Sequence, residues 1–311
     1  MARIMSQKKL HFFHFTFVFA LIVVLLIPQQ SYAVQNQKFD GSKAYLTLWF
    51  DHAFADQIPA INAMVEADLH GAILVRTGVI GNPEYMTWND LNFYANHGIE
   101  MIDHSVTHPI ISPITSQGKL VKEVLTSKST LQQHGFRVLG YLSPYDLITS
   151  ESARLIDSHF KYSVVPSVKQ NTVKSISTEG KQYGFNVPVL QHYGVGIPPG
   201  PPLNNFTAAK TQIDYAILHH TWLVLNFHQL DNKLISYHAD PKLFQEILKY
   251  IKQKVATKQI TVVTPSEGLG LSNKYTNYGT DMTAVEITTN HRHPKHSALP
   301  TFINYDLQYG Q

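Results

Sequence analysis

Two histidines four residues apart, His104 and His108, have a type and spacing that suit metal chemistry. They follow a short, largely apolar run at residues 98–102, and a helical turn after that run would point both rings the same way. Neutral imidazole is the commonest side-chain metal ligand, and catalytic zinc takes three protein ligands and keeps one position open. Because the chain has 17 histidines, such a pair also arises by chance. The pair therefore indicates a metal site only if other segments supply further ligands.

Other chemically capable residues also follow segments that read as strands. They are Asp51, His52, Tyr145 and His228. The carboxyl ends of the strands of a parallel barrel share one face, and active sites are built on that face. The sequence therefore predicts an enzyme whose site combines these residues with the histidine pair.

Apolar runs alternate along the chain with segments of helical periodicity. The predicted strands are residues 44–50, 72–75, 99–103, 137–142, 162–165, 222–227 and 259–263. The predicted helices are residues 58–65, 88–96, 118–134, 150–159, 208–220 and 241–254. This alternation favours an α/β fold with a parallel sheet and crossover helices. The segment 192–206, rich in glycine and proline, is predicted to be a surface loop.

The first 33 residues have the organisation of a secretory signal peptide. Basic residues come first, an apolar core covers residues 15–27, and Ser31-Tyr32-Ala33 offers small residues for cleavage. The apolar core is short for a membrane-spanning anchor, so we expect export to the periplasm or the medium. The expected division is a signal peptide at 1–33, a flexible lead-in at 34–43, one α/β domain at 44–270 and a polar extension at 271–311.

Charge and cysteine content exclude some partners. Removing the signal leaves 311 − 33 = 278 residues, with 25 − 3 = 22 basic and 22 acidic residues, so the formal net charge is zero. The basic footprint of a nucleic-acid-binding protein is therefore absent. The chain has no cysteine, which excludes disulfides and a lipid-modified cysteine anchor. We expect an exported protein with no stable membrane anchor after signal cleavage.

Four short segments occur in a characteristic order. Trp49-Phe50-Asp51-His52-Ala53 is similar to Thr-Phe-Asp-Asp-Gly, and His104-Ser105-Val106-Thr107-His108 matches His-Ser/Thr-x-x-His. Leu142-Ser143-Pro144-Tyr145 is similar to Arg-x-Pro-Tyr, and Leu225-Asn226-Phe227-His228 matches Leu-x-x-His. Over residues 44–268 the chain thus resembles the polysaccharide deacetylases of the NodB-homology class, carbohydrate esterase family 4. One further motif of that class, an acidic residue near a tryptophan, is not identified here.

The resemblance implies a distorted (β/α) barrel, with seven parallel strands expected, that holds one divalent metal ion, with zinc expected. It implies a hydrolase that removes acetyl groups, N-acetyl groups above all, from an acetylated polysaccharide or oligosaccharide. The matching positions imply Asp51 as general base, His228 as general acid, His104 and His108 as metal ligands, Tyr145 as a backbone N–H donor to the oxyanion, and Leu225 in the acetyl pocket.

Three positions depart from the pattern of that class. His52 replaces an aspartate that ligates the metal, Leu142 replaces an arginine that orients the base, and Ala53 replaces a glycine. We favour a three-histidine site that His52 completes, since catalytic zinc accepts such a ligand set. Asp103 or Asp56 as substitute ligands, and loss of the metal, are the alternatives. Two other functions therefore stay open, a glycan-binding protein without catalysis and a hydrolase of another C–N bond.

Overall fold

The computed structural model describes residues 38–111, 115–147, 149–167, 172–174, 177–178, 181–182, 193–195, 205–233 and 238–271. The predicted signal peptide at 1–33 lies outside these residues, and so does the predicted extension beyond Leu271. In the part of the chain that is described, no helix has both the length and the apolar character needed to cross a membrane.

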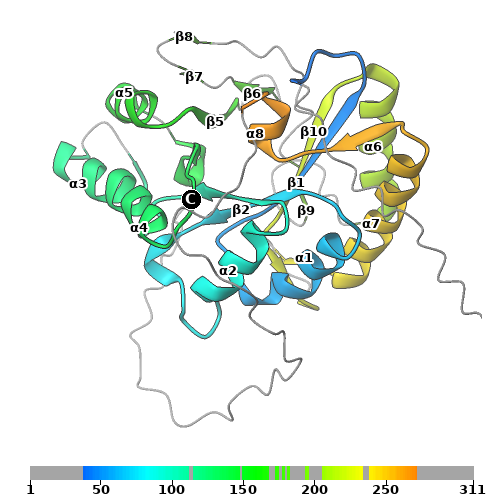
Figure 1. Ribbon diagram of the computed structural model, residues 1–311, viewed down its shortest axis with the longest axis horizontal. Helices are drawn as coiled ribbons and strands as arrows, with labels where there is room; N and C mark the ends of the chain where they lie inside the picture. Colours follow the sequence, from blue (N-terminus) through cyan, green and yellow to red (C-terminus); the bar gives the residue numbers. More distant parts are fainter. Residues whose placement is uncertain are drawn as a thin grey trace, which may run out of the picture.

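A curled sheet forms the centre of the domain (Figure 1). Its strands run in the order β6-β5-β4-β3-β2-β1-β10-β9, and β13 pairs with the first residues of β1. Their bounds are β1 Ala44–Phe50, β2 Gly71–Val75, β3 Ile99–Asp103, β4 Gly140–Leu142, β5 Tyr162–Ser167, β6 Thr172–Lys174, β9 Tyr193–Val195, β10 Trp222–Phe227 and β13 Ile260–Val262. All neighbours are parallel except β5 and β6. This half-barrel confirms the predicted distorted α/β barrel, with a strand count close to the seven expected.

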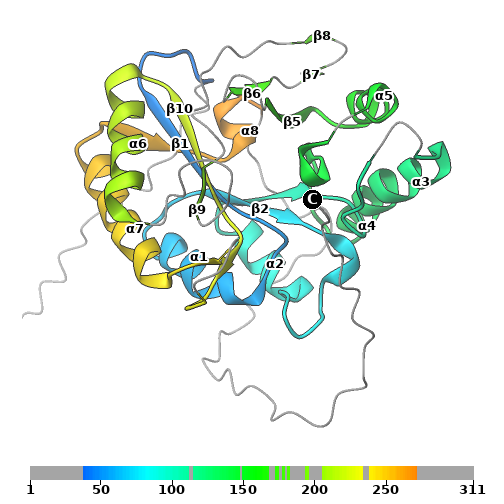
Figure 2. The same ribbon diagram turned by 180° about the vertical axis from the view of Figure 1, so that it is seen from behind.

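Helices pack around the outside of the sheet. Figures 1 and 2 show α6 and α7 on one side, α3, α4 and α5 on the opposite side, and α1 and α2 between them. Their bounds are α1 Ile58–Val65, α2 Trp88–Ala95, α3 Gln117–Val121, α4 Ser127–Gln133, α5 Ser150–His159, α6 Phe206–His219, α7 Pro241–Ala256 and α8 Pro265–Gly268. The crossover helices that the alternating pattern predicted are thus present.

Short elements surround the carboxyl ends of the strands. The 3-10 helices are η1 Ala55–Gln57, η2 Thr77–Val79 and η4 Pro144–Asp146, and η3 Lys122–Thr126 is a π-helix. The remaining strand pairs are β7 Ser177–Thr178 with β8 Lys181–Gln182, and β11 Gln229–Leu230 with β12 His238–Ala239. The 3-10 helices each follow a central strand within a few residues, so they shape the loops that carry the candidate site residues.

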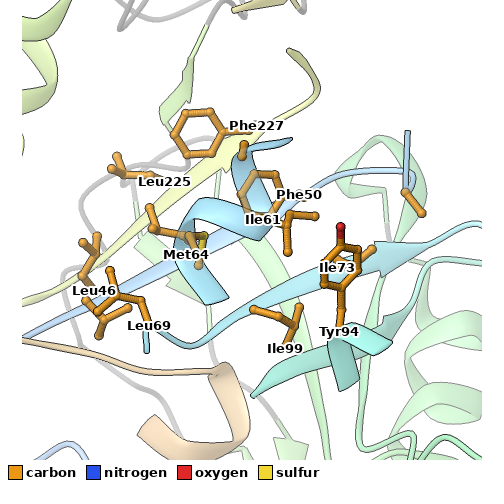
Figure 3. Close-up of a cluster of buried hydrophobic side chains, with 14 of the residues drawn as sticks. Leu46, Phe50, Ile61, Met64, Leu69, Ile73, Tyr94, Ile99, Leu225 and Phe227 are labelled. Atoms are coloured by element: carbon orange, nitrogen blue, oxygen red, sulfur yellow. The ribbon is translucent and has the colours of Figure 1, made fainter. Parts of the chain in front are cut away.

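Side chains alternate between two buried clusters along each strand. The inner cluster, inside the curl of the sheet, includes Tyr45, Trp49, Ala72, Leu74, Ile102, Leu142, Trp222 and Val224. The outer cluster, between sheet and helices, includes Leu46, Leu48, Phe50, Ile73, Val75, Met101, Leu223, Leu225 and Phe227. Figure 3 shows Phe50 and Phe227 of the outer cluster together with Ile61 of α1. Continuing the alternation beyond the strand ends puts Asp51, His104 and His228 on the inner side.

The structure differs from the predicted elements in four places. The predicted helix 118–134 contains the π-helix η3, and β4 covers only the second half of 137–142. Strand β9 lies inside the predicted loop 192–206, where Tyr193, Gly194 and Val195 pair in parallel with β10 although the segment is rich in glycine and proline. Phe39, in the lead-in expected to be flexible, packs against Tyr45 and Trp222 with ring centroids 5.1 and 5.9 Å away. An aromatic ring that buries itself in this way holds the segment in place.

Candidate metal centre and catalytic pair

Three histidines meet at the carboxyl end of the sheet. His52 follows β1, His104 and His108 follow β3, and one ring nitrogen of each lies within 4.8 Å of the others. The ring centroids are 5.2 Å apart for His52 and His104, 4.5 Å for His52 and His108, and 4.7 Å for His104 and His108. The structure therefore brings the three predicted metal ligands together.

Asp51 lies against this cluster and is 5% exposed. Its Oδ1 is 3.3 Å from His104 Nε2 and 3.5 Å from His52 Nε2, and its Oδ2 is 3.0 Å from His228 Nε2. Burial raises the pKa of Asp51, but positive charge on the imidazoles of His52, His228 and His104 and the hydrogen bond from His228 lower it well below its usual value. Where His52 and His104 are neutral, the contact with His228 is the one that keeps the carboxylate ionised. The carboxylate is therefore ionised and in contact with His228, the predicted general acid.

Burial keeps the three histidines of the cluster neutral. It lowers the pKa of His52 to about 4, and burial together with the neighbouring imidazoles lowers the pKa of His108 to about 2. The pKa of His104 is also lowered, mainly by burial. Neutral imidazole is the form that binds a metal ion. The ligand set is therefore ready for a cation at neutral pH without first losing protons.

One hydrogen bond selects the tautomer of His104. Its Nδ1 lies 2.8 Å from the Leu142 carbonyl oxygen, to which it donates, so the lone pair of Nε2 faces the cluster. Among the described residues, His104 Nε2, His52 Nε2 and Asp51 Oδ1 are buried and have no hydrogen-bond partner. Buried polar atoms without partners are costly and point to an ion or water that the atoms share. The donor set thus fits a divalent cation, and two or more imidazoles suit zinc.

The loop from Asp103 to His108 is not helical, which corrects the expected helical turn. Ser105 and His108 have left-handed backbones, with φ of 69° and 61°. The Ser105 N–H donates to Asp103 Oδ1 at 2.9 Å, and the His108 N–H donates to Ser105 Oγ at 3.0 Å. These local bonds, rather than an i to i+4 ladder, turn both imidazoles toward His52. Asp103 points to Ser105 and Ser127 instead of the cluster, so it is not a substitute ligand.

Glu123 holds this loop from outside. Its carboxylate accepts from the Thr107 N–H and the Thr107 hydroxyl, both at 2.8 Å, and its carbonyl accepts from the Val106 N–H at 3.2 Å. Glu123 lies in the π-helix η3, and π-helical turns are frequent at functional sites. The π-helical turn therefore directs the Glu123 carboxylate at the loop that carries His108.

Asp103 yields a pH-dependent prediction. Burial raises its pKa to about 8, although hydrogen bonds from Ser127 and the Ser105 N–H oppose the shift. Between roughly pH 4 and 8 the folded protein therefore binds one proton more than the unfolded chain, and the free energy of unfolding falls as pH rises. In Asp103→Asn the amide oxygen still accepts both bonds but does not titrate. Urea unfolding from about pH 5 to 8 should show a smaller loss of stability in this variant, while Asp157→Asn on α5 keeps the wild-type slope. Parallel profiles for Asp103→Asn and the wild type would contradict the assignment.

Gln57 is a residue of the site that sequence reasoning missed. It is fully buried, and its Nε2 lies 2.8 Å from the Asp51 carbonyl oxygen, 2.6 Å from that of His228 and 3.4 Å from that of Phe227. The Asp51 N–H also donates to the Phe227 carbonyl at 2.8 Å. One amide therefore ties the end of β1 to the end of β10 and sets the spacing of Asp51 and His228. No sequence motif marks it, and it lies just before the predicted helix at 58–65.

Removing this amide should weaken both the fold and the site. Gln57→Met keeps the size of the side chain but leaves buried carbonyls without a donor, which costs about 1–3 kcal/mol. We expect the urea midpoint to fall accordingly and turnover to fall with it, because Asp51 and His228 are less well held. Gln132→Met on exposed α4 is the matched control. An unchanged urea midpoint for Gln57→Met would show that the amide does not hold the two strands.

Backbone strain gathers around the cluster. His52, Ala53 and Tyr145 have φ of 66°, 58° and 54°, in addition to the two residues of the β3 loop. A left-handed conformation costs about 1–2 kcal/mol for a residue with a Cβ. Ala53 stands where the resembling class has a glycine, and its positive φ is the conformation that glycine adopts without cost. Strain of this kind persists where function requires it.

The two remaining predicted site residues, Tyr145 and Leu225, differ in whether they lie beside the cluster. Tyr145 is 52% exposed in η4, and its ring lies 4.6 Å from that of His108, so it borders the cluster. Leu225 is fully buried in the outer cluster, on the opposite side of β10 from His228, and does not reach the site. Side chains along a strand point alternately to its two faces, so Leu225 and His228, three residues apart, point to opposite sides. Two groups of described residues have ligand atoms within 4.8 Å of one another, the three-histidine cluster and a second group made of Asp51, His52 and His228. Asp56, whose pKa is raised by burial, belongs to neither group.

Aromatic residues border the cluster on two sides. Phe54 lies edge-on to His52 at 5.5 Å and stacks on Tyr85 at 5.0 Å, with an interplanar angle of 24°. Tyr145 stands on the other side, against His108. All three are partly or largely exposed. Flat aromatic faces beside a polar centre offer a surface on which the apolar face of a sugar ring can rest.

The fold and the cluster define a parallel α/β half-barrel with a candidate metal centre next to a carboxylate–histidine pair. Among solved structures, a putative polysaccharide deacetylase from Mycobacterium smegmatis is similar, with 13% identity, a TM-score of 0.55, and coverage of 73% of this chain and 89% of that chain. A peptidoglycan N-acetylglucosamine deacetylase is similar with 13% identity, a TM-score of 0.50 and coverage of 75% and 92%. A carbohydrate esterase family 4 pseudoenzyme from Bacillus anthracis, in a mutant with restored activity, is similar with 10% identity, a TM-score of 0.50 and coverage of 74% and 69%.

These similarities show that the chain has the fold of the polysaccharide deacetylases of carbohydrate esterase family 4, as the four motifs implied. No protein-family model matches the chain, and no curated protein matches it. The identities are low, so the likeness is one of fold, and the chemistry has to be argued from the residues of this chain.

Proposed function

We propose that the protein is an exported, metal-dependent hydrolase that removes acetyl groups, N-acetyl groups first, from a polysaccharide. One observation carries the proposal. The buried carboxylate of Asp51 touches His228 on one side and two members of the three-histidine cluster on the other. These contacts support a base, an acid and a cation site around one point, an arrangement suited to acyl hydrolysis.

In this proposal His52, His104 and His108 hold the ion, and zinc suits a set of neutral nitrogen ligands. When bound, a divalent ion supplies Lewis acidity that polarises an acetyl carbonyl and makes water more acidic. Loss of the aspartate at position 52 leaves no ligand carboxylate in the set. The ion therefore keeps more of its positive charge than it would beside an aspartate.

The residues of the chain supply the proton transfers. Ionised Asp51 takes a proton from the attacking water, and its low pKa leaves the carboxylate unprotonated at neutral pH. His228, hydrogen-bonded to Asp51, donates a proton to the leaving amine. The Tyr145 N–H has no backbone acceptor among the described residues, and Tyr145 borders the cluster through its ring contact with His108. We assign it as a donor to the developing oxyanion.

A specific observation also favours a second function, a glycan-binding protein without catalysis. Position 142 is a leucine, packed in the inner cluster, so no arginine from β4 reaches Asp51. Instead, Asp51 contacts three imidazoles. If these do not hold the carboxylate as an arginine would, the cluster and the aromatic residues that border it remain while turnover is lost. Pseudoenzymes with this fold are known.

Acetate release distinguishes the two functions. The chain from residue 34 on, loaded with zinc, is incubated with chitin oligomers and with acetylated polysaccharides, and acetate is measured together with zinc content. Acetate release that requires zinc supports the hydrolase. Binding of the oligomers with about one zinc per chain and no release favours the binding protein, and release of a product other than acetate favours another C–N hydrolase. Export is tested separately, by locating the full-length protein after expression in cells.

A further inference from the structure

Arg76 occupies an inward position beside the candidate metal centre. It directly follows Val75, the last residue of β2, and Val75 pairs in register with Asp103 of β3. The next register position therefore pairs Arg76 with His104, whose N–H donates to the Val75 carbonyl at 3.1 Å. Ala72 and Leu74 belong to the inner cluster. The same alternation that turns His104 inward thus turns Arg76 inward, and neighbouring residues at one register position share a face.

Arg76 is partly buried, and no described residue forms an ion pair with it. Its Nε is buried and has no hydrogen-bond partner among the described residues. Arg154, on the surface of α5, shows the ordinary alternative, because it pairs with Glu151 at 3.2 Å. A guanidinium that is partly withdrawn from water without a carboxylate partner has donors available for a ligand.

The charge of Arg76 acts on the cluster itself. After burial and the neighbouring imidazoles, the positive charge of Arg76 is a further cause of the lowered pKa values of His52, His104 and His108. Arg76 also lowers the pKa of Tyr85 against the rise that burial causes. Arg76 shares its register position with His104, so its side chain lies on the inner side of the sheet, on the same side as the cluster.

The charges of this centre do not balance once a cation is present. With the three cluster imidazoles neutral, the negative charge of Asp51 is offset by Arg76, so a divalent ion would leave an excess of two positive charges, to which a protonated His228 would add a third. In the pattern of the resembling class, an aspartate at position 52 would remove one unit of that excess. Excess positive charge in a partly desolvated site favours an anionic ligand.

We propose that Arg76 forms a subsite for an anionic substituent of the glycan, a carboxylate or a phosphate on the sugar next to the acetylated one. Arginine presents a planar fork of N–H donors that binds either group with two parallel bonds. The inference rests on the proposed function for the identity of the ligand as a glycan. A role in orienting Asp51 in place of an arginine at position 142 fits less well, since the ion-pair contacts of Asp51 are all with histidines.

The test compares three acetylated oligosaccharides of equal length, one neutral, one with a carboxylate-bearing sugar and one with a phosphorylated sugar. The zinc-loaded wild type, Arg76→Gln, Arg76→Lys and the control Arg154→Gln are assayed for kcat/KM of acetate release. We expect the wild-type kcat/KM to be about 10-fold to 100-fold higher for one anionic oligomer than for the neutral one. This ratio corresponds to the free energy of a hydrogen bond to a charged group. Arg76→Gln should bring the ratio close to one, Arg76→Lys should keep part of it, and Arg154→Gln should not alter it. The preferred anion separates carboxylate from phosphate.

Binding gives a readout that does not depend on turnover. The affinity of Asp51→Asn for the same oligomers is measured by calorimetry at two salt concentrations, with and without Arg76→Gln. Tighter binding of the anionic oligomer, weakened by salt and by Arg76→Gln, supports the subsite. Equal affinity and equal turnover for neutral and anionic oligomers would overturn it and leave the deacetylase standing. Absence of acetate from all three oligomers, with the anionic preference in binding intact, would overturn the deacetylase and leave the subsite standing.

Discussion

Asp51→Asn is expected to lower kcat for acetate release by about 100-fold to 10,000-fold, the range that general-base catalysis contributes. Asparagine has nearly the same shape but does not accept a proton at neutral pH. The Asp51 contact with His228 at 3.0 Å would also lose its charge, so the acid is less well supported in protonated form. Initial rates on a chitin oligomer measure the effect.

Zinc content separates two possible roles of Asp51 in this experiment. The Asp51 Oδ1 lies 3.3 Å from His104 Nε2 and 3.5 Å from His52 Nε2. Two ligand atoms on one tetrahedral zinc ion are about 3.4 Å apart, so Asp51 is close enough to be a ligand. A general base predicts normal zinc content in Asp51→Asn, whereas a ligand predicts that zinc and activity fall together. Asp157→Asn on α5 controls for the loss of one charge. Full activity in Asp51→Asn would sink the proposed mechanism.

His52→Ala is expected to weaken zinc binding by at least about 100-fold, since losing a group that only supports a ligand already costs 10-fold to 100-fold. The imidazole of His52 is one of three that meet within 4.8 Å, and two nitrogens hold a cation poorly. Competition with a chromogenic chelator measures the affinity, and elemental analysis measures the content after dialysis.

Two companion variants sharpen this second experiment. His52→Asp supplies the carboxylate that the resembling class has at this position, so it should bind zinc well and tests whether the site accepts either ligand. His219→Ala on the exposed face of α6 removes a histidine outside both groups and should leave zinc unchanged. Unchanged zinc affinity in His52→Ala would refute its role as a ligand and direct attention to Asp51 in its place.

Local sequence was informative about the strands and about the residues at their ends. Apolar runs such as 44–50 and 222–227 form β1 and β10 as predicted, because a strand buried on both faces needs continuous apolar residues. The histidines and Asp51 follow such runs directly, so their convergence was predictable once parallel strands were assumed. The four motifs added the family resemblance, and the fold confirmed it.

The details of the site depended on contacts between distant segments. The spacing of His104 and His108 suggested a helical turn, but backbone N–H groups of the loop donate to the side chains of Asp103, Ser105 and Glu123 and produce a left-handed loop instead. Glu123 lies in the next helical segment along the chain, and the periodicity of the sequence does not predict such a contact. Leu225 matched a motif, yet alternation along β10 puts it on the helix side.

The sequence by itself determined the fold class, the order of the elements and the set of residues able to do chemistry, because these follow from side-chain type and from periodicity along one segment. Only the tertiary structure decided which atoms face one another. It showed that the buried Gln57 amide joins β1 to β10, that the Leu142 carbonyl selects the tautomer of His104, and that Arg76 turns inward with no acidic partner in the part of the chain that the structure describes. Each of these depends on the register and curl of the sheet, which arise when segments far apart in the chain pack together.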